Sequence, residues 1–156
     1  MLLLFEYARK PLDVLSSDAV PPIYHTLAGR PPGSVLELPF GVRDGYGSLG
    51  HERTSAMLFA TVHRHPLIGG MIARLPQSTF DSYAHDPLLG PLLDAQTSGK
   101  PPSLGPAALA RAGALDLRYV VLRPEAEALG KMVEATFAER VAERVVQGHW
   151  TLLVLR

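Results

Sequence analysis

The chain has 156 residues, of which 47% are hydrophobic and 19% charged, so it can bury a core as one folded domain. Its 15 Lys and Arg balance its 15 Asp and Glu, and this zero net charge argues against nucleic acid as a partner, because such binding needs a basic face. The absence of cysteine excludes disulfides, zinc-thiolate sites and cysteine nucleophiles. Neutrality near pH 7 also weakens colloidal repulsion and favours self-association.

The N-terminal part begins with an apolar run. Leu2–Tyr7 is typical of a short buried strand. Met1–Phe5 is far shorter than the roughly 20 residues that span a membrane, so we expect a soluble chain, in the cytoplasm or at a membrane surface. A helix is predicted over Pro21–Ala28, because Asp18 can cap it and Gly29 stands just past its end.

The central part alternates buried and glycine-rich pieces. Val35–Pro39 is predicted to be a buried strand, in which Glu37 is an unexpected carboxylate. Phe40–Gly50 is predicted to be a loop, and Glu52–Val62 a helix that is apolar nearly all round and therefore buried. Shorter features then follow: an apolar piece over Pro66–Met71, helices over Ser78–His85 and Pro87–Leu93, and a flexible loop over Asp94–Pro106.

The last third has the most regular pattern. Its predicted elements are a helix over Pro106–Ala112 closed by Gly113, a strand over Leu117–Leu122, an amphipathic helix over Glu125–Arg140, and a hairpin of strands Val141–Val146 and Trp150–Leu155. Glu127 and Lys131 are expected to pair on the exposed face of that amphipathic helix. The order of elements predicts an α/β fold: one domain over residues 1–156, with a mixed sheet, packed helices and a C-terminal antiparallel hairpin.

Two short motifs resemble, in one case, a dinucleotide-binding loop and, in the other, a catalytic serine turn, but each lacks parts of its signature. The run Gly45–Gly50 matches G-x-G-x-x-G after a strand, yet Gly41–Asp44 intervene and no carboxylate follows about 20 residues later. Ser48 has Tyr46 where a nucleophile elbow needs glycine. We therefore interpret the run as a flexible loop and expect no nucleotide or other cofactor.

Six charged or imidazole side chains gather between positions 37 and 74, threaded among buried pieces. They are Glu37, Arg43, Asp44, His63, His65 and Arg74. Charges beside buried strands cost free energy unless they pair, which leaves two outcomes. In the first outcome, Arg43 or Arg74 forms a structural ion pair with one of the two carboxylates, Glu37 or Asp44. In the second outcome, the six side chains line a pocket. In such a pocket arginine would bind phosphate or carboxylate, and His or Asp would bind hydroxyls.

The same stretch also contains two adjacent glycines and a pair of histidines that could have structural or functional roles. Gly69 and Gly70 would allow close approach of a backbone in either outcome. The run His63-Arg64-His65, with His51 or Asp44, could supply three metal ligands. Because no ligand pair has helical i,i+4 spacing, we predict no metal site and expect these imidazoles to bond to backbone or cap a helix end.

Three runs in this region resemble the soluble C-terminal region of large bacterial polytopic membrane proteins of the mannosyltransferase-like glycosyltransferase type. The runs are Val35-Leu36-Glu37-Leu38-Pro39-Phe40, the segment Thr61-Val62-His63-Arg64-His65-Pro66-Leu67-Ile68-Gly69-Gly70, and Ala73-Arg74-Leu75-Pro76. The flanks, Pro21-Pro22-Ile23-Tyr24 and Leu117-Arg118-Tyr119-Val120-Val121, agree. In that family the membrane part carries the catalytic carboxylates, so the resemblance implies an accessory domain.

Three functions follow as expectations. The first is a non-catalytic accessory or binding domain that contacts saccharide or lipid-linked phosphate groups, or other segments of a membrane assembly. The second is a small enzyme that uses His63 with Asp44 or Glu37 as an acid–base pair. The third is a structural interaction module without a ligand.

Overall fold

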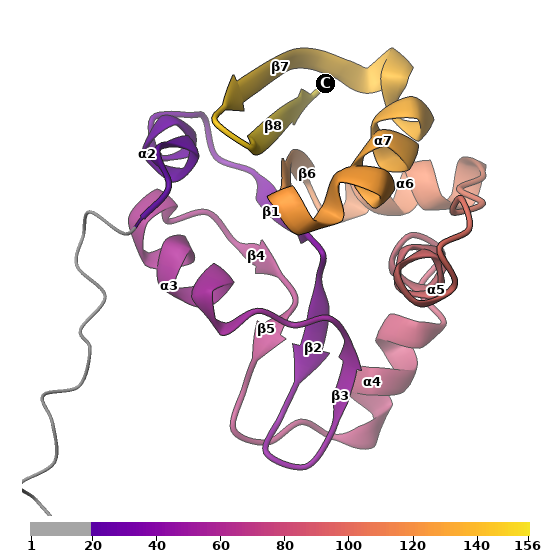
Figure 1. Ribbon diagram of the computed structural model, residues 1–156. Helices are drawn as coiled ribbons and strands as arrows, with labels where there is room; N and C mark the ends of the chain where they lie inside the picture. The colour runs from indigo at the N-terminus through magenta and orange to yellow at the C-terminus, as the bar shows by residue number, and fades with distance from the viewer. Residues whose placement is uncertain (1–19) are drawn as a thin grey trace, which may run out of the picture.

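The computed structural model describes residues 20–156, which form an α/β fold with two β-sheets (Figure 1). The larger sheet has, in order across it, β4 (Leu67–Ile68), β1 (Ser34–Leu38), β6 (Leu117–Leu122), β8 (Trp150–Leu155) and β7 (Val141–Gln147). The smaller sheet consists of β3 (Ser48–Gly50), β2 (Gly41–Arg43) and β5 (Gly70–Met71). The strand predicted over Leu2–Tyr7 and the capping role of Asp18 lie outside the described residues.

The larger sheet is mixed, and this confirms the predicted fold class. β1 runs parallel to both β4 and β6, whereas β6, β8 and β7 are antiparallel neighbours. The C-terminal hairpin of β7 and β8 is the one that the sequence predicts, because its two apolar runs are separated by a short glycine-containing loop.

The helices lie on both faces of this sheet (Figure 1). Their bounds are α2 (Pro22–Ala28), α3 (Thr54–His63), α4 (Gln77–Ala84), α5 (Leu89–Ser98), α6 (Pro106–Ala114) and α7 (Glu127–Thr136), with single 3₁₀ turns η2 (Pro124–Ala126) and η3 (Ala138–Arg140) around α7. Because side chains alternate along a strand, each face of the sheet has its own core. One core joins the sheet to α5, α6 and α7, and its central residues are Leu36, Val120, Leu153, Leu92, Ala112 and Val133.

The opposite face is covered by α2 and α3. Tyr24, Leu27 and Phe59 pack there on the other set of strand side chains, which includes Tyr119 and Leu152. Glu37 alternates with the residues of the first core and therefore also points to this face, where it is 2% exposed.

The chain leaves β1 and β6 in opposite directions. After β1 it passes through the small sheet and α3 to β4, on one side of β1; after β6 it passes through α7 to β7, on the other side. Since α3 and α7 cover opposite faces, the carboxyl ends of β1 and β6 form a topological switch point. In α/β sheets this is where ligands usually bind.

The predicted loop over Phe40–Gly50 is wrong, because most of it forms the β2–β3 hairpin. Gly41 pairs with Gly50, and a Cβ on Gly41 would lie 2.5 Å from the Leu49 carbonyl oxygen. The strands are short and pair glycine with glycine, so their sequence lacks the apolar alternation that predicts a strand.

Several helix predictions need correction at their ends or faces. The helix expected to be buried all round, α3, exposes Met57 and Leu58 by 39% and 37%. The loop predicted from Asp94 begins only at Gly99, where a left-handed conformation ends α5. Gly113 lies inside α6 instead of closing it, and the helix predicted over Glu125–Arg140 is divided into η2, α7 and η3. The other elements appear within a few residues of their predicted bounds, and Glu127 and Lys131 pair as expected, at 2.7 Å.

Candidate functional site

The six side chains predicted as one polar set occupy three separate places in the structure. Asp44 closes the turn between β2 and β3: its Oδ1 accepts the N–H groups of Tyr46 and Gly47, at 2.8 and 2.7 Å, and its Oδ2 accepts that of Leu75, at 3.1 Å. These three donors lower the pKa of Asp44. This carboxylate therefore holds the turn and ties it to the segment at Leu75.

The two arginines predicted to neutralise the buried carboxylates do not do so. Arg43 and Arg74 are both exposed, and the guanidinium of Arg74 lies over the ring of Tyr46, 5.8 Å from its centroid. The contacts described for residues 20–156 join neither arginine to Glu37 or Asp44. The prediction was wrong because it sought the partner of Glu37 among arginines nearby in the sequence.

His63 and His65 form a buried pair between α3 and α2. The Nδ1 atom of His63 accepts the backbone N–H of His65 at 3.0 Å, and the Nε2 atom of His65 lies 3.0 Å from the carbonyl oxygen of Leu27. Burial, and to a lesser degree His65, lowers the pKa of His63 to about 4. Among the described residues no hydrogen bond joins His63 to Asp44 or Glu37, so the geometry does not support the predicted acid–base pair.

The two glycines predicted to allow close approach do so within the protein. Gly69 and Gly70 have φ angles of 95° and 114°, and a Cβ on Gly69 would lie 2.5 Å from the carbonyl oxygen of Gly41. They therefore join the two sheets. Within residues 20–156, no three His, Asp or Glu side chains are placed to hold a metal ion.

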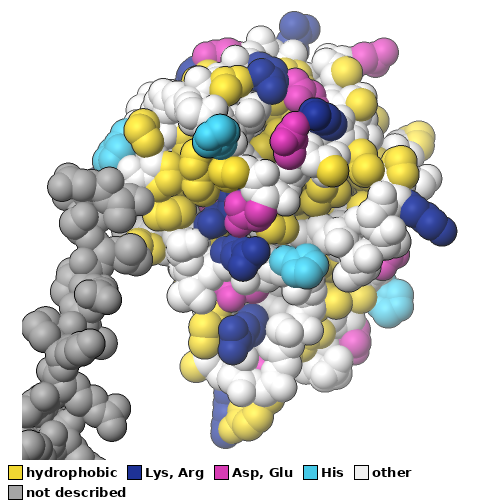
Figure 2. Space-filling model, viewed as in Figure 1, with side chains coloured by type: hydrophobic (Ala, Val, Ile, Leu, Met, Phe, Trp, Pro, Cys, Tyr) yellow, Lys and Arg dark blue, Asp and Glu magenta, His cyan; other side chains and the backbone are white. Residues whose placement is uncertain are grey.

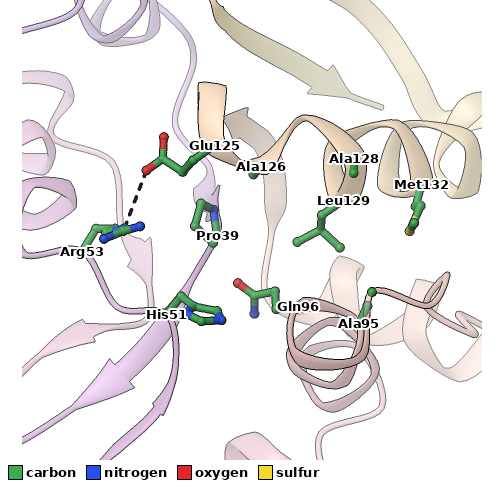
Figure 3. Close-up of a pocket in the computed structure, with 11 residues that line it drawn as sticks. Pro39, His51, Arg53, Ala95, Gln96, Glu125, Ala126, Ala128, Leu129 and Met132 are labelled. Carbon is green, nitrogen blue, oxygen red and sulfur yellow. Dashed lines mark ion pairs between the residues drawn. The ribbon is translucent and has the colours of Figure 1, made fainter.

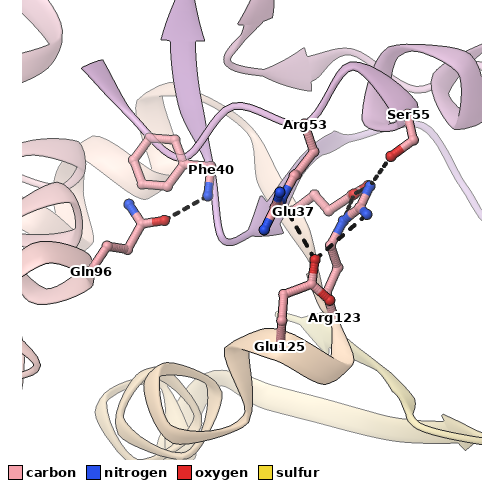
Figure 4. A network of polar contacts seen from close by, with 7 residues as sticks. All are labelled: Glu37, Phe40, Arg53, Ser55, Gln96, Arg123 and Glu125. Carbon is pink, nitrogen blue, oxygen red and sulfur yellow. Dashed lines mark hydrogen bonds and ion pairs between the residues drawn. The ribbon is translucent and has the colours of Figure 1, made fainter. Parts of the chain in front are cut away.

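Glu37 has its partner at the end of the neighbouring strand. Arg123 follows β6 directly, and because β1 and β6 are parallel and in register, its side chain reaches Glu37 and forms a buried ion pair with it (Figure 4). The same guanidinium donates to the Ser55 hydroxyl at 2.9 Å and lies over the rings of Phe59 and Trp150, at 5.5 and 5.2 Å. Burial raises the pKa of Glu37, and the Arg123 guanidinium opposes that rise.

A pocket of about 300 Å³ lies next to this ion pair, at the switch point of the sheet (Figure 3). Its walls come from the segment after β1, from the segment between β3 and α3, from α5 and from the start of α7. The lining residues are Pro39, His51, Arg53, Ala95, Gln96, Gly99, Glu125, Ala126, Ala128, Leu129 and Met132. None of the six predicted site residues is among them.

Polar groups stand on one side of this pocket and apolar groups on the other (Figure 3). Arg53 and Glu125 pair across its rim, at 3.6 Å. Gln96 accepts the backbone N–H of Phe40 at 2.7 Å, which leaves its Nε2 amide buried and without a partner. Leu129 and Met132 form the apolar side. Figure 2 shows acidic, basic and imidazole side chains next to one another across the middle of this face, between α3 and α7.

One sequence signal could have located the buried ion pair beside the pocket. Glu37 and Arg123 are opposite charges at the ends of two strongly apolar strands, and parallel pairing of those strands brings the two charges together. The pocket itself carries no such signal, because its lining is spread over four separate segments.

Comparison with known proteins adds no relative. No protein-family model matches the chain, and no curated protein or solved structure matches it. None of the helices in residues 20–156 is long and apolar enough to cross a membrane.

Proposed function

We propose that this chain is a binding domain that holds a small hydroxylated ligand, of the size of a saccharide unit, in the pocket between the segment that precedes α3, helix α5 and helix α7. The observation that carries the proposal is the place of the pocket: it lies at the carboxyl ends of β1 and β6, where the connections leave for opposite faces of the sheet. Its volume of about 300 Å³ is at the small end of ligand pockets.

The lining of the pocket favours hydroxyl groups. Arg53 offers N–H donors, Glu125 offers carboxylate acceptors, and Leu129 and Met132 offer an apolar surface. A sugar ring has hydroxyls that both donate and accept, and C–H groups that pack on apolar side chains.

Phosphate is a poorer fit than a sugar. Arg53 is the one arginine among the lining residues that the structure describes, and it is already paired with Glu125. Arg123, behind the pocket, is paired with Glu37. A phosphate group needs an uncompensated cation or several free N–H donors. We therefore favour the saccharide part of a glycolipid-like ligand over its phosphate.

The resemblance to mannosyltransferase-like membrane proteins supports the same proposal from a different direction. An accessory domain of such an assembly would bind or present sugar groups without carrying out the transfer. The fully engaged carboxylate of Asp44 and the buried imidazole of His63 are compatible with a non-catalytic role.

The proposal is tested by filling the pocket. Ala128 lines it with an exposed side chain on α7, so Ala128→Phe should obstruct the ligand without disturbing the core. Ala135→Phe, at an exposed position farther along the same helix, is the matched control. By calorimetry with glucose, mannose and glucosamine, we expect dissociation constants of about millimolar for at least one sugar. Ala128→Phe should weaken binding about ten-fold or more. Equal binding by both variants, or none by the unmodified protein, would refute the proposal.

A further inference from the structure

An apolar groove of about 230 Å³ lies between α3 and the two consecutive edge strands β4 and β5 (Figure 1). Met57 and Ala60 line it from α3, and Leu67, Met71 and Ile72 line it from the strands and the residue after them. Met57 is 39% exposed and Ile72 59%, although both are large apolar side chains. The groove shares no lining residue with the pocket at the switch point, so it is a separate surface.

The strand β5 presents an open edge to this groove. It is the last strand of the small sheet, and the N–H of Ile72 donates to the carbonyl oxygen of Arg43 on β2, at 3.0 Å. Because successive N–H groups of a strand point to opposite sides, the N–H of Met71 points to the outer edge. An outer edge of this kind is where a further strand can pair.

The side chain of Met57 occupies that edge. Its sulfur accepts the N–H of Met71 at 3.0 Å, in an exposed contact. A thioether is a weak acceptor and its side chain is flexible, so a backbone carbonyl oxygen would bind the same N–H better and displace the sulfur. Met57 therefore stands where the carbonyl of an added strand would lie.

Three exposed arginines surround the groove. Arg43 is the register partner of Met71 on β2, Arg64 ends α3, and Arg74 follows Ile72 by two residues. Among the contacts described for residues 20–156, none of the three has an ion pair with a carboxylate. The rim of the groove is therefore basic.

The sequence supplies no acidic residue to neutralise this rim from within the same segment. Residues 53–80 contain three arginines and no Asp or Glu, although the whole chain is neutral. Glu52 and Asp81, at the two ends of this stretch, do not line the groove. Asp44, next to Arg43, already accepts three backbone N–H groups. Such a rim favours an anionic partner.

The charges and the shape together decide which occupant fits. A second copy paired edge to edge along β5 would bring the arginines of both copies together, and like charges at an interface cost free energy. A lipid surface takes up apolar side chains that project from a protein, whereas Met57 and Met71 line a groove. A peptide fits both features, because it has carbonyls for an open edge and can carry carboxylates for the arginines.

We infer that this groove binds an extended acidic peptide segment of a partner protein, which adds as a strand to the outer edge of β5. Backbone hydrogen bonds to Met71 hold the segment, an apolar side chain of the peptide packs against Met57, and its carboxylates pair with the three arginines. The inference is independent of the proposed sugar site.

The experiment compares three hexapeptides with blocked ends, by NMR titration of the ¹⁵N-labelled full chain. The first, Asp-Val-Asp-Val-Asp-Val, should bind with a dissociation constant of about millimolar and move the amide signal of Met71 most. Lys-Val-Lys-Val-Lys-Val has the opposite charge and should bind at least about ten-fold more weakly. Asp-Pro-Asp-Pro-Asp-Pro keeps the charge but cannot pair as a strand, and it should also bind at least about ten-fold more weakly.

Variants of the chain separate the backbone from the charges. Met57→Leu keeps the apolar bulk but removes the sulfur acceptor, so it should bind the first peptide at least as tightly as the unmodified protein. Arg43→Gln with Arg64→Gln should weaken binding about five-fold. Lys100→Gln with Arg156→Gln removes two exposed cations that do not line the groove, and should leave binding within about two-fold.

Equal binding of the valine and proline peptides would overturn the inference, because charge alone would then attract them. Binding of the first peptide without a shift at Met71, or no binding of it, would also overturn the inference. So would an exclusive response of the Met71 amide to vesicles of phosphatidylcholine and phosphatidylglycerol, or to rising protein concentration. Those two results would assign the groove to a lipid surface or to a second copy.

Discussion

Glu37 and Arg123 compensate each other's charge in a place where water has almost no access. The carboxylate is 2% exposed and the arginine 7%, and two aromatic rings cover the guanidinium. An ion pair of this kind contributes little net stability compared with apolar residues, but the loss of one partner leaves the other charge buried alone. Removing either partner should therefore cost more than the pair itself contributes.

Replacing Arg123 with methionine should destabilise the protein strongly. We expect Arg123→Met to lower the free energy of unfolding by about 3–5 kcal/mol, because Glu37 stays buried without its partner. Lys131→Met removes the exposed partner of Glu127 and should cost less than about 1 kcal/mol. Urea denaturation of both variants gives the comparison. If both variants lost equally little, Glu37 would not depend on Arg123.

His63 should make the stability of the protein depend on pH. Its pKa is about 4 in the folded protein against an ordinary value of 6.5, so between these values the unfolded chain binds more protons. Stability is thus fully present above about pH 6.5 and falls as the pH drops towards 4, by up to about 3 kcal/mol. Urea denaturation at several pH values measures this loss.

His63→Asn keeps an acceptor near the backbone N–H of His65 but does not titrate, so its stability should be nearly flat over this range. His149→Asn, at an exposed position, should retain the slope of the unmodified protein. A His63→Asn variant with the full slope would assign the pH dependence to another group.

At the residue level, the sequence indicated which buried polar groups require a partner, but it did not identify the partner of Glu37. It indicated that Glu37 must be neutralised and that the imidazoles of His63 and His65 would bond to backbone, and the structure shows both. It could not identify Arg123, because the distance along the chain between the two charges is large and only strand pairing brings them together.

Among the elements, the junction between the two sheets depends on Gly69. Its φ of 95° is rarely adopted by other residues, and a Cβ would lie 2.5 Å from the carbonyl oxygen of Gly41. Gly69→Ala should therefore destabilise the protein by about 2 kcal/mol or more in thermal unfolding. Gly113→Ala, in α6 with open space around it, should instead stabilise by about 0.5–1 kcal/mol. Equal effects would show that the close approach is relaxed in solution.

Elements with a clear apolar period were predictable, and those formed by distant pairing were not. β6 and β8 match their predicted bounds, because each carries a continuous apolar run. The sequence did not predict the small sheet, because β2 pairs with β5 at Gly70, and the two glycines there interrupt the apolar pattern that would indicate a strand. Its strands are two or three residues long, which is too short for a periodic pattern.

For the molecule as a whole, the connections of the sheet place the pocket. The opposite exits after β1 and β6 leave a crevice at the carboxyl ends of these strands. The segment before α3, helix α5 and helix α7 supply its walls. The sequence correctly predicted the α/β class and the mixed sheet. It could not predict the strand order, so residues as distant as Arg53, Gln96 and Leu129 could not be assigned to one site.

The location of sugar binding is the most direct test. In two-dimensional NMR spectra of the ¹⁵N-labelled protein titrated with glucosamine, the largest amide shifts should occur at Arg53, Gln96 and Leu129, from three walls of the pocket. The signals of Arg43 and Arg74, on the exposed small sheet and its flank, should stay unchanged. Shifts centred on those two arginines, or no shifts at saturating sugar, would contradict a saccharide site at the switch point.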